Sequence, residues 1–150
     1  MAKYSIIVPA YNEEKTLRLF YSAVNPLFDG LGEDYEMIFV NDGSRDATKD
    51  VLREIAAKDK RVKVCSFSRN FGQQAGFLCG LKCASGDAVV TIDVDLQDPP
   101  ELIAEMVEKW RQGYEIVHTR RRKRAGETAF KKFSAKCFYL FSKKITGLDI

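Results

Sequence analysis

Three acidic side chains and one amide follow a short apolar run in the middle of the chain. The run from Val89 to Ile92 is rich in β-branched residues, which predicts a buried strand. Directly after it come Asp93, Asp95, Gln97 and Asp98. Carboxylates this close repel one another unless a cation neutralises them. Because alternate residues of an extended chain point the same way, Asp93, Asp95 and Gln97 are predicted to converge on Mg²⁺ or Mn²⁺, with positions left open for phosphate oxygens.

Acidic motifs of this kind also occur in other structures and activities. Asp beside Pro is common in ordinary turns. An EF-hand loop starts with the same alternation of Asp residues, but its sixth position here is Asp98 instead of Gly and its twelfth is Ala104 instead of Glu, so an EF-hand is excluded. A metal-dependent phosphohydrolase with an Asp nucleophile stays open as a weaker alternative. A metal–diphosphate site is favoured because of the elements that precede the motif.

Apolar segments that alternate with helical patterns predict the elements around the motif. Strands are predicted at residues 4–8, 35–40, 62–66, 88–92 and 115–119, with helices between them. Ser44 is the expected N-cap of the second helix, and the fourth helix is expected from about Pro100 to Arg111. His118 is interpreted as a packed strand residue. This alternation indicates βα units in an α/β fold with a mostly parallel sheet flanked by helices.

Polar residues follow four of these strands, at the edge where ligands bind in such folds. They are Tyr11-Asn12-Glu13, Asp42, Arg69-Asn70 and Asp93 to Asp98. The dinucleotide fingerprint and the Walker phosphate loop are both absent, which disfavours hydride transfer and P-loop phosphoryl transfer. Gly72, Gly76 and Gly80 recur every four residues, which favours close packing of a helix on the sheet over a phosphate cradle at Gly72.

The charge of the 150-residue chain is unevenly distributed. Residues 120–144 hold ten Lys or Arg against one acid, a balance of +9, whereas the remainder holds 14 basic and 20 acidic residues, a balance of −6. Phe residues recur at helical spacing between Phe130 and Phe141. A basic amphipathic helix of this kind can lie on an anionic membrane, with about 1 kcal/mol from each basic residue, so membrane contact is favoured over packing on the sheet or on another subunit. Nucleic-acid binding is not expected, because few aromatics interleave with the basic run.

Two further features limit the class of protein. No apolar run approaches the ~20 residues that a membrane-spanning helix needs, so the chain itself is expected to be soluble. The four cysteines show no paired metal spacing and are predicted to be reduced core residues: Cys65, Cys79, Cys83 and Cys137.

Four motifs, in order at predicted strand ends, resemble family 2 glycosyltransferases. They are Ile7-Val-Pro9-Ala-Tyr11-Asn12-Glu13, Val40-Asn-Asp42-Gly43-Ser44, Arg69-Asn70-Phe-Gly72 and Asp93-x-Asp95-x-Gln97-Asp98-Pro-Pro. The last motif is similar to the polyprenyl-phosphate branch, which includes dolichol-phosphate mannosyltransferases and undecaprenyl-phosphate (bactoprenol) glucosyltransferases. The resemblance covers nearly all of the chain and implies a GT-A-type nucleotide-binding fold, incomplete at the C-terminus.

The same resemblance implies roles for individual residues. Pro9, Tyr11 and Glu13 would contact the base and ribose of a nucleotide-sugar, and Asp42 would hydrogen-bond the base. Asn70 is assigned to the same nucleotide-binding group.

For the transfer itself, Asp93 and Asp95 are the predicted catalytic residues. Asp95 and Gln97 would hold the divalent ion on the diphosphate. Arg120 and Arg122 are the predicted phosphate-binding residues, although a solvated basic stretch explains them almost as well.

The predicted function is inverting transfer of a sugar, from UDP-glucose or a similar donor, to a polyprenyl phosphate. Residues 1–119 would form the donor-binding domain, and residues 120–150 a basic amphipathic arm that leads into a missing C-terminal part. The full-length protein is expected at the cytoplasmic face of the membrane, and this fragment is expected to be inactive alone. A nucleotide-sugar-binding module without turnover is the alternative, and a homo-oligomer stays open because the absent half would leave apolar surface bare.

Overall fold

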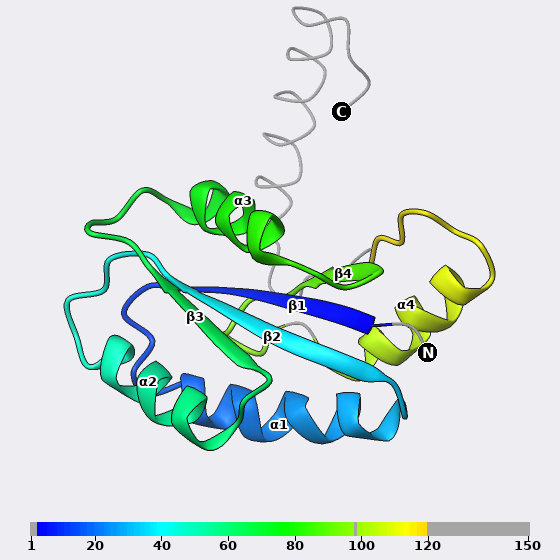
Figure 1. Ribbon diagram of the computed structural model, residues 1–150, viewed down its shortest axis with the longest axis horizontal. Coiled ribbons are helices and arrows are strands. Elements are labelled where there is room, and N and C mark those ends of the chain that lie inside the picture. The colour runs from blue at the N-terminus through cyan, green and yellow to red at the C-terminus, as the bar shows by residue number, and fades with distance from the viewer. Residues whose placement is uncertain (1–2, 98, 120–150) are drawn as a thin grey trace, which may run out of the picture. The chain divides into compact units, whose positions relative to one another are not determined.

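The computed structural model in Figure 1 describes residues 3–97 and 99–119. Within these ranges, strands and helices alternate along the chain. They are β1 (Lys3–Ala10), α1 (Leu17–Gly30), β2 (Asp34–Asn41), α2 (Thr48–Lys58), β3 (Val62–Ser66), α3 (Gln73–Cys83), β4 (Ala88–Thr91) and α4 (Leu102–Arg111). No helix in the described ranges has the length and apolar character needed to cross a bilayer.

The four strands form one parallel sheet in the order β3-β2-β1-β4. The chain therefore builds outward from β1 through β2 to β3 and then returns to the other side of β1 for β4. Residues of β1 and β2 are almost all buried, which explains why both strands are nearly continuous apolar runs. The predicted parallel α/β arrangement is confirmed.

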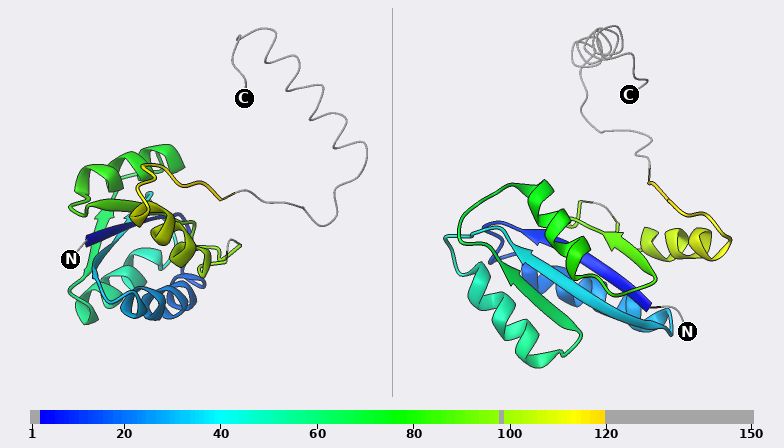
Figure 2. Two further views of the ribbon diagram at one scale, coloured as in Figure 1. Left: turned by 90° about the vertical axis from the view of Figure 1, so that its right-hand side faces the viewer. Right: turned by 45° about the horizontal axis from the view of Figure 1, so that its top comes forward.

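Helices cover both faces of the sheet (Figures 1 and 2). Side chains from α1, α2 and α4 share one hydrophobic core with the facing side chains of β1 and β2, including Phe20, Leu52, Ile103 and Phe39. Alternate residues of β1 and β2 point to the opposite face, where α3 packs. Both sides of the central strands are thereby removed from water.

Close packing of α3 on the sheet depends on two glycines. A Cβ atom added at Gly76 would lie 3.3 Å from the Cβ of Pro9, and one added at Gly80 would lie 2.3 Å from the Cγ2 of Ile7. The repeat of small residues in this helix is therefore a packing feature, as the sequence indicated. A methyl group at Gly80 would force α3, β1 or the Ile7 side chain to move, whereas one at Gly76 would need a shift of only a few tenths of an ångström.

Three sequence-based predictions are wrong: the strand at residues 115–119, the packing of His118 in it, and Ser44 as a helix cap. Residues 115–119 form no strand, and Ile116 and His118 are exposed, because an apolar segment needs a neighbouring strand to pair with and this one has none among the described residues. Ser44 is not a helix cap: its N–H donates to Asn41 Oδ1 in a turn, and α2 begins only at Thr48. The predicted fourth helix is confirmed: α4 starts within two residues of the approximate start at Pro100 and ends at Arg111 as expected.

The prediction that the cysteines are core residues is also wrong. Cys65 and Cys79 are half-buried and Cys83 is exposed, so the three are not core residues. Their spacing in the sequence did not reveal that they lie together in space. Cys137 lies outside the described residues.

A buried carboxylate fastens the turn that follows α3 to the sheet. Glu36 of β2 accepts hydrogen bonds from the Ser5 hydroxyl (2.6 Å) and from the backbone N–H of Ser85 (2.7 Å). Lys63 and Lys3 lie 2.5 Å and 3.6 Å from its second oxygen. Burial alone would raise the pKa of Glu36, but hydrogen bonds from Lys63, Ser5 and Ser85 outweigh it and lower the pKa from 4.5 to about 2.

Replacement of Gly80 tests the glycine contact. Gly80→Ala is expected to lower the free energy of unfolding by about 1–3 kcal/mol, because the added methyl group collides with Ile7. Urea denaturation measures the change. Gly30→Ala is the matched control, since nothing lies within 4 Å of a Cβ at that helix end. Equal stability of the two variants would show that α3 moves away from β1 without cost.

Glu36 predicts a pH dependence of stability. Because its pKa is lower in the folded protein, its contribution is full above pH 4.5 and disappears as the pH falls from 4.5 towards about 2. Glu36→Gln should therefore unfold more easily than the parent at neutral pH, and the difference should vanish near pH 2. Thermal unfolding across this range measures it, with exposed Glu105→Gln as control. Parent and Glu36→Gln curves that stay parallel down to pH 2 would contradict the assignment.

Candidate nucleotide-sugar site

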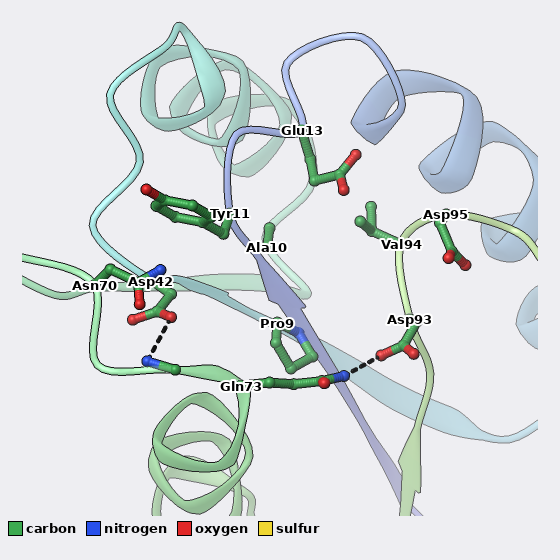
Figure 3. Close-up of a pocket in the computed structure, with 11 residues that line it drawn as sticks. Pro9, Ala10, Tyr11, Glu13, Asp42, Asn70, Gln73, Asp93, Val94 and Asp95 are labelled. Carbon is green, nitrogen blue, oxygen red and sulfur yellow. Dashed lines mark hydrogen bonds between the residues drawn. The ribbon is translucent and has the colours of Figure 1, made fainter. Parts of the chain in front are cut away.

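A cavity of about 340 Å³ lies beyond the carboxyl ends of β1, β2 and β4 (Figure 3). It opens beside the point where the order of strands reverses, between β1 and β4. In open α/β sheets, loops separate at this point and leave a crevice in which ligands bind. Its lining consists of Pro9, Ala10, Tyr11, Glu13, Asp42, Asn70, Gly72, Gln73, Asp93, Val94 and Asp95.

Most of the site residues predicted from the sequence line this one cavity. They are Pro9, Tyr11, Glu13, Asp42, Asn70, Asp93 and Asp95. Gln97 is exposed and does not line it. Arg120 and Arg122 lie outside the described residues. The roles assigned to all of these residues stay predictions.

Asp42, just after β2, fixes the loop that precedes α3. Its carboxylate is buried and accepts hydrogen bonds from the backbone N–H groups of Phe71 (2.7 Å) and Gly72 (2.9 Å). The loop passes so close that a Cβ atom at Gly43, where φ is +65°, would lie 2.2 Å from the carbonyl carbon of Arg69. Asp42 therefore positions Asn70 and Gly72 at the cavity wall, a structural role that the sequence did not reveal.

The loop after β1 is held by the loop that precedes α2. Asn12 has a positive φ of 58°, and its backbone N–H donates to the Ser44 hydroxyl at 3.0 Å. The backbone N–H of Glu13 donates to the Thr48 hydroxyl at 2.7 Å. These bonds keep the Glu13 side chain at the cavity, while Tyr11 presents a ring that is 41% exposed.

Asp93 and Asp95 stand on the opposite wall from Tyr11 and Asn70 (Figure 3). One oxygen of Asp93 accepts a hydrogen bond from the side-chain amide of Gln73, at 2.7 Å. One oxygen of Asp95 accepts the backbone N–H of Gln97 at 3.1 Å. No sequence pattern indicated Gln73, because only the fold brings the start of α3 beside the end of β4.

The chain beyond Asp93 is not extended. Val94 and Asp95 form a turn, and Leu96 has a positive φ of 55°. Alternate residues point the same way only in an extended chain, so Gln97 is not expected to point where Asp93 and Asp95 do. The Gln97 side chain does not line the cavity with the carboxylates of Asp93 and Asp95.

The donor set fits a hard divalent ion that takes few ligands from the protein. Asp93 and Asp95 are both exposed at the cavity, and each has a second carboxylate oxygen that no hydrogen bond among the described residues uses. No three acidic side chains of the described residues gather within 4.8 Å of one another there. Mg²⁺ and Mn²⁺ commonly bind through one or two carboxylates and complete their shell with water and substrate phosphate.

Comparison with known proteins decides the family. The sequence profile described as "Glycosyl transferase family 2" matches residues 5–148. The chain belongs to glycosyl transferase family 2. It is 51% identical over 148 residues to the uncharacterized glycosyltransferase YkcC of Bacillus subtilis (strain 168), covering 99% of this chain and 46% of that protein. It is 40% identical over 148 residues to the prophage bactoprenol glucosyl transferase homolog of Escherichia coli (strain K12), covering 99% and 48%.

Solved structures agree with the family assignment. The crystal structure of glucosyl-3-phosphoglycerate synthase from Mycobacterium tuberculosis in complex with UDP is 30% identical, with a TM-score of 0.57. The match covers 76% of this chain and 41% of that one. The predicted GT-A-type fold is confirmed. This family 2 chain spans about half the length of the curated relatives it matches.

Asp42→Asn tests how the site is held together. The amide retains one acceptor oxygen and turns an N–H donor towards another donor, so we expect a loss of about 1.5–3 kcal/mol in the free energy of unfolding. Hydrogen exchange at Phe71 and Gly72 should accelerate. Asp34→Asn, at the exposed start of β2, is the control. Unchanged protection of both amides in Asp42→Asn would contradict this role.

Proposed function

We propose that this chain forms the donor-binding part of an enzyme that transfers a sugar from a nucleotide-sugar to a polyprenyl phosphate, with inversion at the anomeric carbon. The observation on which this depends is one cavity with two chemically different walls. Tyr11, Asn70 and Asp42 lie on one side and Asp93 and Asp95 on the other (Figure 3). An aromatic and amide wall suits a base and ribose, and a carboxylate wall suits a diphosphate that brings a cation.

The two walls of the cavity would determine how the donor is oriented. With the base and ribose against Pro9, Tyr11 and Glu13, the diphosphate extends towards Asp93 and Asp95. A bound divalent ion would neutralise charge on the departing diphosphate. Asp95 is the proposed ligand of this ion. Gln97 is proposed as a second ligand, which requires the backbone after Asp95 to turn so that the Gln97 side chain faces the cavity.

The acceptor explains why the described cavity needs no strong general base. A phosphate monoester has a second pKa of about 6, so its oxygen is already ionised near neutral pH. Attack by this oxygen opposite the leaving diphosphate forms the new glycosidic bond as the old one breaks. One displacement of this kind inverts the configuration. Arg120 and Arg122 are proposed to bind the acceptor phosphate or the leaving diphosphate.

Names of similar proteins support the choice of acceptor and donor. A relative 40% identical to this chain is described as a bactoprenol glucosyl transferase homolog, which supports a lipid-phosphate acceptor and a glucose donor. A structure 30% identical contains UDP, which supports UDP-glucose over a GDP-sugar. Residues 120–150 are proposed as a basic arm at an anionic membrane surface, separate from the donor-binding domain of residues 1–119.

The cavity supports a second function, in which the chain binds a nucleotide-sugar without turning it over. The same lining residues would contact the donor in both cases. The two functions share the same cavity and differ only in whether product forms. Both are tested by one set of measurements.

Calorimetric titration with UDP, UDP-glucose, GDP and GDP-mannose, each with and without Mn²⁺, measures donor binding. We expect UDP-glucose to bind best and only with the ion. Asp95→Asn should weaken that binding by about tenfold or more, equivalent to about 1.4 kcal/mol, whereas exposed Glu105→Gln should leave it unchanged. Glucose transfer to undecaprenyl phosphate by a chain extended to the length of its relatives would select the enzyme over the binding module.

Two results would contradict the proposal. Binding of all four nucleotides that is indifferent to Mn²⁺ and to Asp95→Asn would remove the metal–diphosphate site. Release of inorganic phosphate from simple phosphoesters, without sugar transfer, would favour a metal-dependent phosphohydrolase.

A further inference from the structure

Three cysteine side chains lie together on the face of the sheet that α3 covers. Cys65 belongs to β3, and Cys79 and Cys83 belong to α3. The three sulfur atoms all lie within 4.8 Å of one another, and the sulfurs of Cys65 and Cys83 are 3.6 Å apart. In the described part of the chain this is the only group of three or more His, Cys, Asp or Glu side chains so arranged.

The fold explains why these residues meet. Cys79 and Cys83 are four residues apart, so they lie on the same side of α3. The contact of Gly76 and Gly80 with β1 and β2 brings the helix backbone close to the sheet. This close approach lets two short side chains of α3 reach a side chain of β3.

The separations match those of sulfur ligands around one metal ion. In a tetrahedral site with Zn–S bonds of about 2.3 Å, neighbouring sulfurs are about 3.8 Å apart. The separations here, 3.6 Å for one pair and under 4.8 Å for the others, need only small side-chain adjustments to reach that value. Thiolate ligands select soft or borderline ions, Zn²⁺ and Cu⁺ among them, over Mg²⁺ or Mn²⁺.

Simple packing and a disulfide explain the cluster less completely. Cys83 is exposed, so burial in a core does not account for its position. A disulfide needs sulfurs about 2.05 Å apart and uses two cysteines, which leaves the third beside it without a role. An ion bound by three thiolates uses all of them and reaches water through the exposed side of Cys83.

We propose that Cys65, Cys79 and Cys83 bind a single thiophilic metal ion of the Zn²⁺ class, with water in the fourth position. None of the three residues lines the nucleotide-sugar cavity, so this site is separate from the proposed magnesium or manganese site. The ion would fasten α3 to β3, the two elements that flank the loop carrying Asn70. This proposal does not depend on the proposed function.

Metal titration of the reduced chain tests the proposal. Zn²⁺ in competition with a chromophoric chelator should bind at one ion per chain, and Co²⁺ should give the thiolate charge-transfer and tetrahedral ligand-field bands. Cys65→Ser, Cys79→Ser and Cys83→Ser should each weaken Zn²⁺ binding at least about tenfold. Cys137→Ser is the control and should bind as the parent does. Circular dichroism of each variant without metal establishes that it is folded.

Thermal unfolding gives a second measurement on the unmodified chain. Zn²⁺ should raise the unfolding temperature of the parent and of Cys137→Ser, and should leave that of Cys65→Ser unchanged. Absence of stoichiometric Zn²⁺ binding by the reduced parent would overturn the proposal, as would equal loss of binding in Cys137→Ser. Failure to bind Zn²⁺ combined with a loss of two hydrogens by mass under air would identify a Cys65–Cys83 disulfide instead.

Discussion

Two buried carboxylates of one strand region hold α3 on the sheet, and the candidate site depends on that attachment. Glu36 lies near the start of β2 and Asp42 directly after its end. They are six residues apart in an extended segment, so both point to the face that α3 covers. Asp42 accepts the backbone N–H groups of Phe71 and Gly72 just before the helix, and Glu36 accepts that of Ser85 just after it.

This attachment compensates for the burial of two carboxylates and for the lack of large apolar side chains between α3 and the sheet. A buried carboxylate is expensive unless hydrogen bonds or cations compensate for lost water, and both residues have that compensation. Helix α3 lacks the large inward side chains that normally fasten a helix to a sheet, because Gly76 and Gly80 face β1. Hydrogen bonds at both ends of α3 therefore fix its position on the sheet, and the glycines between them allow close contact.

Sequence reasoning identified the parallel α/β fold and most of the cavity lining, because both follow from local patterns. Strands that alternate with helices imply parallel pairing, and polar residues directly after strands fall at one edge of the sheet. It did not identify features that depend on distant partners. The hydrogen bond from Gln73 to Asp93, the two bonds of Asp42 and the meeting of Cys65 with Cys83 each join separate elements. The strand predicted at residues 115–119 was wrong because apolar alternation does not supply a pairing partner.

The same long-range bonds connect the two walls of the cavity. Gln73 opens α3 and donates to Asp93 after β4, while the residue before it, Gly72, donates to Asp42 after β2. One end of α3 is thus joined to both walls of the cavity. The second oxygen of Asp93 accepts no hydrogen bond among the described residues, so it is free for a further ligand while the bond from Gln73 holds the start of α3 in place. Asp42 holds the adjacent residue, so the same end of α3 also fixes the loop with Asn70.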